Sequence, residues 1–377
     1  MLRGNSMGYM LHLILFLLFN YYHGRIGVNF DTYSDLIGWD ESYWVEGSSC
    51  GWDSLFDLCF NTYLNLYPFY IYILRVVGFS FFDFTLLKCI LYLFSVFYVT
   101  RTLKILKLPN VSIFKLFLLL NPYIILLHIT ALRDDIIIVF TLVCVAFLYR
   151  LQNKKNNVNI SEFFLIALSV FMLFSLRLGF GAIALLSVLS TIIFRRKIRL
   201  HYRYFLFILG IIIFYFLAQP YAPTFDFSVF FSNLRKLILS PSPWNVINGK
   251  ILILETDTSL LPIYSVIFPI FSFYVMLRLC VDLFSKYNCV CSSLRIHLYP
   301  LIFAISLLMP YALSPLDVAG PRQSLTSTLI FFYIFGARYV RFKLSWETYL
   351  WHSPDLVDMW YQSPRIKLMS SHKVGSR

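Results

Sequence analysis

Three arginines stand between apolar stretches of the chain. They are Arg133 in "TALRDDIIIVF", Arg177 in "FSLRLGFG" and Arg322 in "GPRQS". A charged side chain inside hydrocarbon is costly, so such residues mostly face water, a partner or a substrate. A guanidinium binds phosphate through two parallel hydrogen bonds and keeps its charge at any accessible pH. The three arginines are therefore candidate ligands for a pyrophosphate group.

Carboxylates alternate with aromatic residues in segment 25–47, "RIGVNFDTYSDLIGWDESYWVEG". A carboxylate can bind a sugar hydroxyl or act as a general base, and an aromatic face can stack on a sugar ring. Asp31 and Asp35 are the candidate bases. Tyr33 and Trp39 are the candidate sugar contacts. The alternative interpretation is an aromatic belt at a membrane interface with solvated acids.

Two aspartates, Asp134 and Asp135, directly follow Arg133. A carboxylate at this point could pair with Arg133 or take a proton, which makes Asp134 a further candidate catalytic residue. The alternative is structural. An aspartate in the first turn of a helix complements the helix dipole, typically by about 0.3–1 kcal/mol, and could do no more than begin a helix.

The composition predicts which elements hold these residues. Of 377 residues, 59% are hydrophobic, 19% aromatic and only 14% charged, and the mean hydropathy is +0.71. Apolar runs of roughly 17 to 25 residues with short charged connectors are typical of transmembrane helices, and they predict an all-α polytopic membrane protein with about ten spans. The predicted spans are 7–22, 83–103, 111–131, 135–151, 160–177, 179–195, 203–219, 262–284, 296–314 and 324–341.

The basic residues predict the orientation of these spans. The net charge is +13, and lysines and arginines cluster at the ends of alternate apolar runs, at 101–107, 150–155, 195–203 and 341–343. The positive-inside rule places these clusters, and with them both termini, in the cytoplasm. This distribution explains the charge better than a nucleic-acid surface, so no nucleic-acid partner is expected. No small-residue cleavage site follows the first run, which predicts an uncleaved first helix.

In this topology the chain has three outer segments that are large or charged enough to form a site, 23–82, 220–261 and 314–324. Part of the first, "LYPFYIYILRVVGFSFFDF", is interrupted by charge and glycine and predicts an amphipathic helix along the outer membrane surface. Residues 1–341 form the predicted transmembrane domain, and residues 342–377 form a polar cytoplasmic tail.

The sequence predicts neither a cofactor nor a metal site. It has no GxxxxGK[ST], no GxGxxG after a strand, no HExxH and no GxSxG, and its histidines never pair at metal-ligand spacing. Cys289 and Cys291 lack the second pair of a typical zinc site. Cys50 and Cys59 share the first outer segment and could form a disulfide in an oxidising compartment.

The order of three segments resembles the bacterial polysaccharide (O-antigen) polymerases of the Wzy and EpsG type. These are "GRIGVNFDTYSDLI", then "YPFYIYILRVVGFSFFDF", then "NPYIILLHITALRDDIIIVF". The matching motifs are Gly27 to Tyr33 around Asp31, and Arg133 with Asp134. The layout is also similar to that of GT-C glycosyltransferases, which place a catalytic aspartate in the first outer loop. Both families act on polyprenyl-linked sugars at the outer face of the membrane.

The resemblance implies a multi-pass enzyme of the bacterial inner membrane that joins polyprenyl-pyrophosphate-linked oligosaccharide repeat units, beside other membrane proteins of polysaccharide assembly. Arg133, Arg177 and Arg322 would hold the pyrophosphate of the donor, because developing negative charge on a leaving group needs cations. Asp31 or Asp35 would deprotonate the acceptor hydroxyl. Two alternatives stay open, a GT-C transferase that adds one sugar from a polyprenyl-phosphate donor, and a transporter or flippase for lipid-linked sugars.

Overall fold

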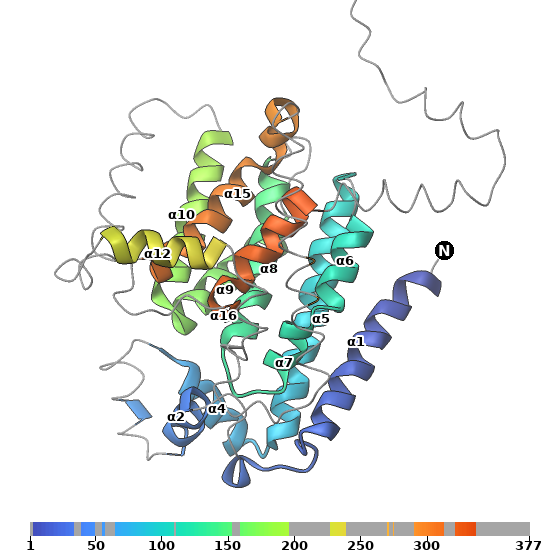
Figure 1. Cartoon of the computed structure of the whole chain (residues 1–377), viewed down its shortest axis with the longest axis vertical. Helices are drawn as coiled ribbons and strands as arrows, with labels where there is room; N and C mark the ends of the chain where they lie inside the picture. Colours follow the sequence, from blue (N-terminus) through green and yellow to red (C-terminus); the bar gives the residue numbers. More distant parts are fainter. Residues whose placement is uncertain are drawn as a thin grey trace, which may run out of the picture. The chain divides into compact units, whose positions relative to one another are not determined.

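A computed structural model gives the arrangement of the helices (Figure 1). It describes residues 3–33, 39–49, 55–56, 65–108, 111–152, 159–195, 227–238, 290–312 and 321–336, with the single residues 270 and 274. The chain divides into two compact units, Met1–Ala337 and Arg338–Arg377, and the second lies outside the described residues. Every regular element in the described residues is a helix, so the predicted all-α class is confirmed.

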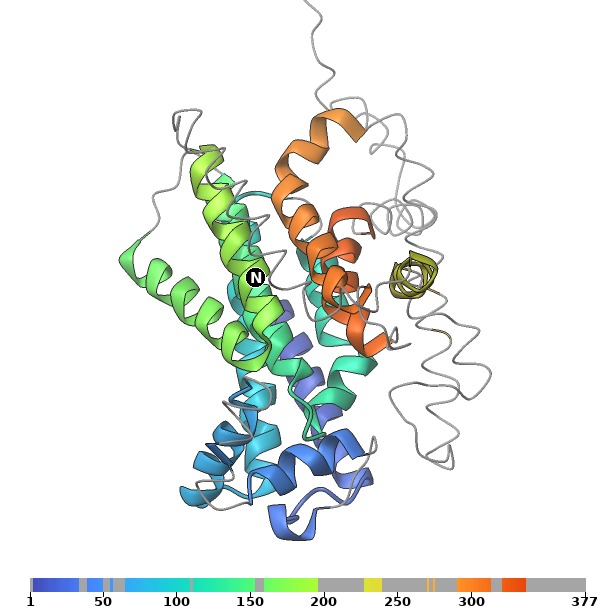
Figure 2. The same ribbon diagram turned by 90° about the vertical axis from the view of Figure 1, so that its left-hand side faces the viewer.

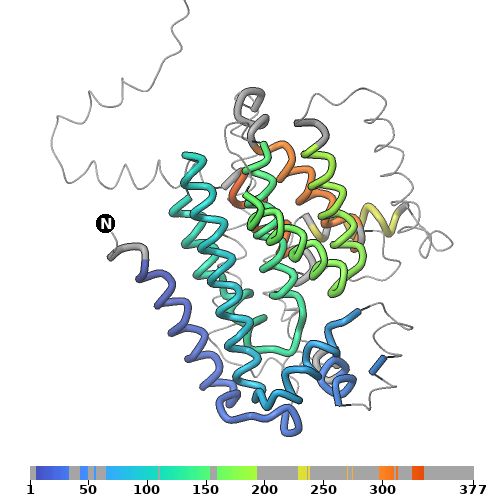
Figure 3. The backbone as a smooth tube through the Cα atoms, turned by 180° about the vertical axis from the view of Figure 1, so that it is seen from behind, coloured from blue at the N-terminus to red at the C-terminus, as the bar shows by residue number. Residues whose placement is uncertain are grey.

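Long helices of the described residues begin and end close to six of the predicted spans. They are α1 (Arg3–Tyr22), α5 (Phe81–Ile105), α8 (Asp134–Gln152), α9 (Ile160–Leu176), α10 (Leu178–Arg195) and α15 (Val290–Ala312). Helix α8 contacts α5, α9, α10 and α15, and it is buried on nearly every side. A helix that is apolar all round belongs in the middle of a bundle. Figure 3 shows α1 beside α5 and α6, which it also contacts.

The predicted span 111–131 is not one helix. It forms α6 (Val111–Leu119) and α7 (Pro122–His128), whose axes are bent by 47° at the break. Proline has no N–H to donate and its ring clashes with the preceding turn, so a helix that meets a proline in its interior kinks or ends. Pro122 therefore accounts for the break.

Side chains satisfy the backbone groups that this break leaves without helical partners. Pro122 cannot donate to the carbonyl of Leu118, and the hydroxyl of Tyr92 donates to that carbonyl instead, at 2.8 Å. Asn121 is the N-cap of α7, where its side-chain oxygen accepts from the N–H of Tyr123 at 3.0 Å. Buried backbone groups are almost always paired, and these two side chains keep that rule at the break.

The amphipathic helix predicted within 66–84 ends at Val76, and the described parts of the predicted first outer segment, 23–82, form short helices. They are η1 (Phe30–Thr32), α2 (Trp39–Gly47) and α4 (Tyr67–Val76). After α4 the chain turns at Gly78, whose φ of +90° suits glycine far better than other residues, and α5 begins five residues after α4 ends. Figure 2 shows these short helices grouped beside the start of α5.

Towards the C-terminal end of the first unit, α16 (Pro321–Phe331) continues into a π-helix, Phe332–Gly336. A further helix, α12 (Phe227–Ile238), lies in the second outer segment, where the sequence predicted no helix. The predicted spans 203–219 and 262–284 fall outside the described residues, apart from residues 270 and 274.

Helix length and composition do not support ten membrane crossings. Within the described residues, α5 is the one helix that is long and apolar enough to span a bilayer, and the bent pair α6 and α7 would count as a second if taken together. Several other helices are apolar but shorter, such as α9 with 17 residues. A span typically has about 20 apolar residues and at least about 17, so these helices are at or below the short end of that range in this structure.

Candidate functional site

The turns that carry Arg133 and Arg177 lie in contact, although 43 residues separate Arg133 from its hydrogen-bond partner Leu176. Arg133 directly precedes α8, and its Nη1 donates to the carbonyl of Leu176 at 3.0 Å. Leu176 is the last residue of α9, where carbonyls have no partner within the helix. Arg177 follows it and joins α9 to α10. The two predicted outer turns therefore lie against each other.

A close helix pair holds Arg177 in place. A Cβ atom at Gly181, in the first turn of α10, would lie 2.5 Å from the Cα of Phe174 in α9. Only glycine fits there, so the sequence "LRLGFG" permits a tight α9–α10 turn with Arg177 at its apex. The N–H of Gly181 donates to the carbonyl of Arg177 at 3.2 Å, which starts α10 immediately.

Each of these half-buried guanidiniums lies over an aromatic ring. The Cζ of Arg133 is 4.8 Å from the ring centre of Trp44 in α2. The Cζ of Arg177 is 4.4 Å from the ring centre of Tyr311 in α15, and its Nη1 also donates to the Tyr311 hydroxyl. Cation–π contact orients a guanidinium plane without neutralising its charge. Both arginines thus keep a positive charge beside a flat apolar surface.

The first outer segment contributes an exposed carboxylate. Asp31 accepts from Nη2 of Arg75 at 2.6 Å, and its side chain remains 81% exposed. Arg75, in α4, also donates to Oγ of Ser48 at 3.2 Å, just after α2. Exposed ion pairs contribute little stability, so Asp31 is held in place yet accessible. The sequence analysis did not select Arg75, although it is the charged residue inside "YPFYIYILRVV".

Tyr33 packs among aromatic and basic side chains near the end of α1. Its ring centre is 4.5 Å from that of Phe81, and the Cζ of the buried Arg25 lies 4.7 Å from the Tyr33 ring centre. Arg25 is a second basic residue that the sequence analysis did not select. Since Tyr33 already packs against two side chains, it offers a sugar less aromatic surface than the sequence predicted.

Hydrogen bonds also join the first outer segment to the end of α9. The N–H of Leu66 donates to the carbonyl of Ser175 at 2.8 Å, and the hydroxyl of Tyr70 donates to Oγ of Ser175 at 2.7 Å. Burial raises the pKa of Tyr70 above its ordinary value. A continuous series of contacts therefore runs from Asp31 through Arg75, α2 and Arg133 to Arg177.

For three predicted site residues the structure describes no side chain. Asp35 lies outside the described residues. Trp39 begins α2 and Arg322 is the second residue of α16, but the described part of the chain does not include their side chains. The turns of Arg133 and Arg177 are in contact through the Leu176 carbonyl, whereas the convergence of the three guanidiniums on one pyrophosphate stays a prediction.

Asp135, the neighbour of Asp134, forms a buried ion pair. Its Oδ2 lies 2.8 Å from Nζ of Lys88, and both side chains are 1% exposed. The same oxygen accepts from Nδ1 of His128 at 3.1 Å. Asp134 is buried and lies in the first turn of α8, which is the position that the helix-dipole alternative assigned to it. Its catalytic role stays a prediction.

Lys88 is a third basic residue that the sequence analysis did not select. Besides Asp135, its ammonium donates to the carbonyls of Leu127, Thr130 and Leu132, at 3.1, 2.8 and 3.0 Å. These carbonyls belong to the end of α7 and the turn before α8, so one cation fixes the turn that carries Arg133. A lysine inside the apolar run "LLKCILYLF" was a signal that could have found it.

No protein-family model matches the chain, and neither does any curated protein or solved structure with which it was compared.

Proposed function

We propose that the chain is a membrane enzyme that joins polyprenyl-pyrophosphate-linked oligosaccharide repeat units at the outer face of the bacterial inner membrane. The observation that carries the proposal is the contact of Arg133 with the carbonyl of Leu176, directly before Arg177, with each arginine beside an aromatic ring. Two permanent cations on adjoining turns suit a pyrophosphate, and flat aromatic surfaces suit sugar rings.

Exposed apolar side chains support a membrane location. On α1, Met10 is 63% exposed; on α5, Phe94 is 58% exposed; on α9, Phe164 is 71% exposed. Large contiguous apolar surfaces are rare on soluble monomers and mark contact with a membrane or another protein. In the proposed arrangement lipid covers these faces. Helix α9 and the other short helices cross the bilayer with little tilt, at places where the protein thins it.

The proposed reaction needs three roles. Asp31 accepts the proton of an acceptor hydroxyl, whose oxygen then bonds to the anomeric carbon of the donor sugar. The bond between that carbon and the pyrophosphate oxygen breaks, and the lipid pyrophosphate leaves with the bonding electrons. Arg133 and Arg177 stabilise its growing negative charge, with Arg322 as the proposed third cation. Asp35, Tyr33 and Trp39 keep their predicted roles as alternative base and sugar contacts.

One observation favours the transporter as a second candidate. The ion pair of Lys88 with Asp135 is buried in the helix bundle, next to the broken helix pair α6 and α7. Transporters commonly place broken helices and ionisable residues around a substrate site. The GT-C transferase is a third candidate, since it would use the same exposed aspartate in the first outer segment.

Deleting the gene distinguishes the three candidates by the sugars that accumulate. Loss of a polymerase leaves complete single repeat units on the lipid carrier and removes long surface chains. Loss of a single-sugar transferase leaves a repeat unit that lacks one residue, and loss of a transporter leaves complete units in the inner leaflet alone. Mass spectrometry of extracted lipid-linked sugars, with gel analysis of surface polysaccharide, reads all three outcomes. Unchanged sugars in the deletion strain would contradict the proposed function.

A further inference from the structure

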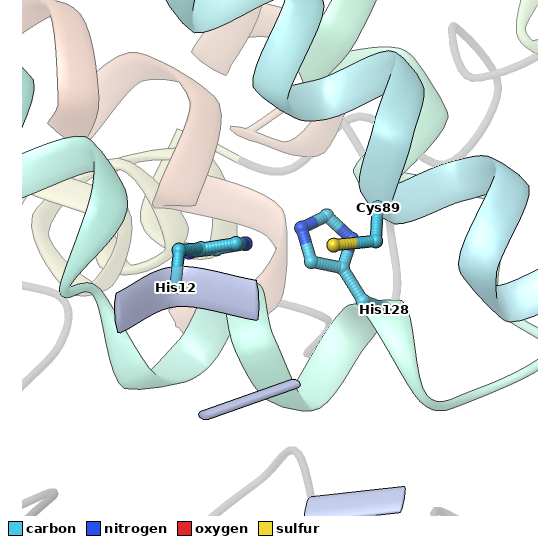
Figure 4. A group of neighbouring side chains, drawn as sticks. All are labelled: His12, Cys89 and His128. Atoms are coloured by element: carbon cyan, nitrogen blue, oxygen red, sulfur yellow. The ribbon is translucent and has the colours of Figure 1, made fainter. Parts of the chain in front are cut away.

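Three buried side chains from three different helices point toward one another in the bundle (Figure 4). They are His12 of α1, Cys89 of α5 and His128 of α7, and none of them has any exposed surface. Their nearest ligand atoms all lie within 4.8 Å of one another. Spacing along the sequence could not predict this group, because each member comes from a separate helix.

Hydrogen bonding fixes which nitrogen of His12 carries a proton. Its Nδ1 lies 2.7 Å from the carbonyl of Leu119. A carbonyl can only accept, so Nδ1 holds the proton and Nε2 presents a lone pair. The carbonyl of Leu119 is available because the N–H of Tyr123, its usual helical partner, donates to Asn121 instead.

His128, like His12, carries its proton on Nδ1. Its Nδ1 lies 3.1 Å from Oδ2 of Asp135, a carboxylate that also faces the ammonium of Lys88 at 2.8 Å. A carboxylate oxygen accepts the Nδ1 proton, which leaves a lone pair on Nε2 of the neutral imidazole. Histidine that donates one ring N–H to a carboxylate or carbonyl is the usual arrangement around a bound metal.

Neither lone pair is satisfied within the described residues. The Nε2 atoms of His12 and His128 are both buried without a hydrogen-bond partner there. The nearby Tyr92 ring packs against both imidazoles, but its hydroxyl donates to the carbonyl of Leu118. The thiol of Cys89 has one proton and can serve only one nitrogen. A cation would satisfy both nitrogens and the sulfur together.

We propose that His12, Cys89 and His128 bind a d10 metal ion, zinc(II) or copper(I). One thiolate and two imidazoles form a soft to borderline ligand set, which both ions favour over magnesium or calcium. Bond lengths of about 2.0–2.1 Å to nitrogen and about 2.3 Å to sulfur place ligand atoms roughly 3.3–3.8 Å apart. Small side-chain rotations would close the observed group to that size.

The net charge of the occupied site differs between the two ions. Binding transfers the Cys89 proton to solvent, so the site gains one thiolate charge per metal. Copper(I) then gives a neutral three-ligand site, whereas zinc(II) leaves one positive charge and calls for a fourth ligand. The metal would tie α1 to α5 and α7. This inference does not rest on the proposed function, because neither the site nor its measurement involves sugar transfer.

The test is metal binding by the full-length protein in detergent. The protein is stripped with chelator and titrated with zinc(II), and with copper(I) under reducing conditions, each in competition with an indicator of known affinity. X-ray absorption then reports the ligands. We expect one ion per chain with a sulfur and nitrogen shell, and at least tenfold weaker binding by Cys89→Ser and by His128→Gln.

Matched variants control for general damage. Cys144→Ser removes another buried cysteine, in α8, and His23→Gln removes another histidine beyond the end of α1. Both should bind like the wild type, and chelator should lower the thermal midpoint of these two but not of Cys89→Ser. Absence of binding by the stripped wild type, or a shell without sulfur, overturns the proposal even if a variant fails to fold. Equal binding by Cys89→Ser overturns it as well.

Discussion

At the scale of single residues, the buried cation Lys88 and the half-buried cation Arg133 have different partners. Lys88 meets a carboxylate and three carbonyls, so its charge is compensated within the protein. Arg133 donates from one nitrogen to the last carbonyl of α9, and its Cζ lies over the ring of Trp44 in α2. Lys88 therefore holds the turn before α8, and Arg133 joins that turn to α9 and α2.

Lys88→Met should destabilise the protein strongly. The change leaves Asp135 buried without its ammonium, and loss of one partner from a buried ion pair costs about 3–5 kcal/mol. Thermal unfolding in detergent measures the effect. Lys104→Met, in the exposed last turn of the same helix, should stay within about 0.5 kcal/mol of the wild type. The double variant Lys88→Met with Asp135→Leu should recover part of the loss, and a double variant that is additive would contradict the pairing.

The sequence predicted which charged residues belong to the candidate site better than it predicted which side chains they contact. Arg133 and Arg177 were found from the sequence because each interrupts an apolar run. The ion pair of Asp135 with Lys88 was not predictable, since neighbouring positions on a helix point about 100° apart and only packing decides which carboxylate faces the lysine of α5. The group of His12, Cys89 and His128 depends on three helices meeting, which no local pattern encodes.

At the scale of elements, the break between α6 and α7 organises both the candidate metal ligands and the ion pair. It frees the carbonyls of Leu118 and Leu119 for Tyr92 and His12. Helix α7, which begins at the break, ends at His128, seven residues before Asp135. The sequence "LNPYIILL" contained the signal, because proline removes a helical hydrogen bond, yet the length of the apolar run predicted one span.

Asn121→Ala should weaken this break. Asn121 is fully buried and its side chain caps α7, and loss of such a cap typically costs about 0.5–2 kcal/mol. Asn121→Ser retains an accepting oxygen without adding a charge at this buried site, and it serves as the matched variant. Thermal unfolding should rank the alanine variant lowest. An alanine variant as stable as the wild type would show that the cap is not what holds α7.

At the scale of the whole molecule, the helical class and the limits of the long helices followed from apolar periodicity, as α1, α8, α9 and α10 illustrate. The number of crossings did not follow, because a break such as the one at Pro122 divides an apolar run into pieces too short to span. Short helices such as α2, α4 and α12 are stabilised by packing, and local sequence predicts them poorly.

Reporter fusions test the proposed topology. Alkaline phosphatase is active only outside the cytoplasm, and green fluorescent protein folds well inside it. A phosphatase fused after Gly249 should be active, and one fused after Lys155 should be inactive, with fluorescent fusions giving the opposite result. The basic clusters near Lys155 motivate this assignment through the positive-inside rule. Phosphatase activity at Lys155 would contradict the topology.

The central claim, that Arg133 binds the pyrophosphate of a lipid-linked sugar, is tested most directly by Arg133→Lys. Lysine keeps the charge but loses the planar fork, so long polysaccharide chains should fall at least tenfold at unchanged membrane abundance. Arg150→Lys, at the other end of α8 where Arg150 pairs with Glu162, is the matched control and should give normal chains. The measurement is polysaccharide chain length in a strain that lacks the wild-type gene, with each variant quantified in the membrane. Chains of wild-type length from Arg133→Lys would contradict the claim.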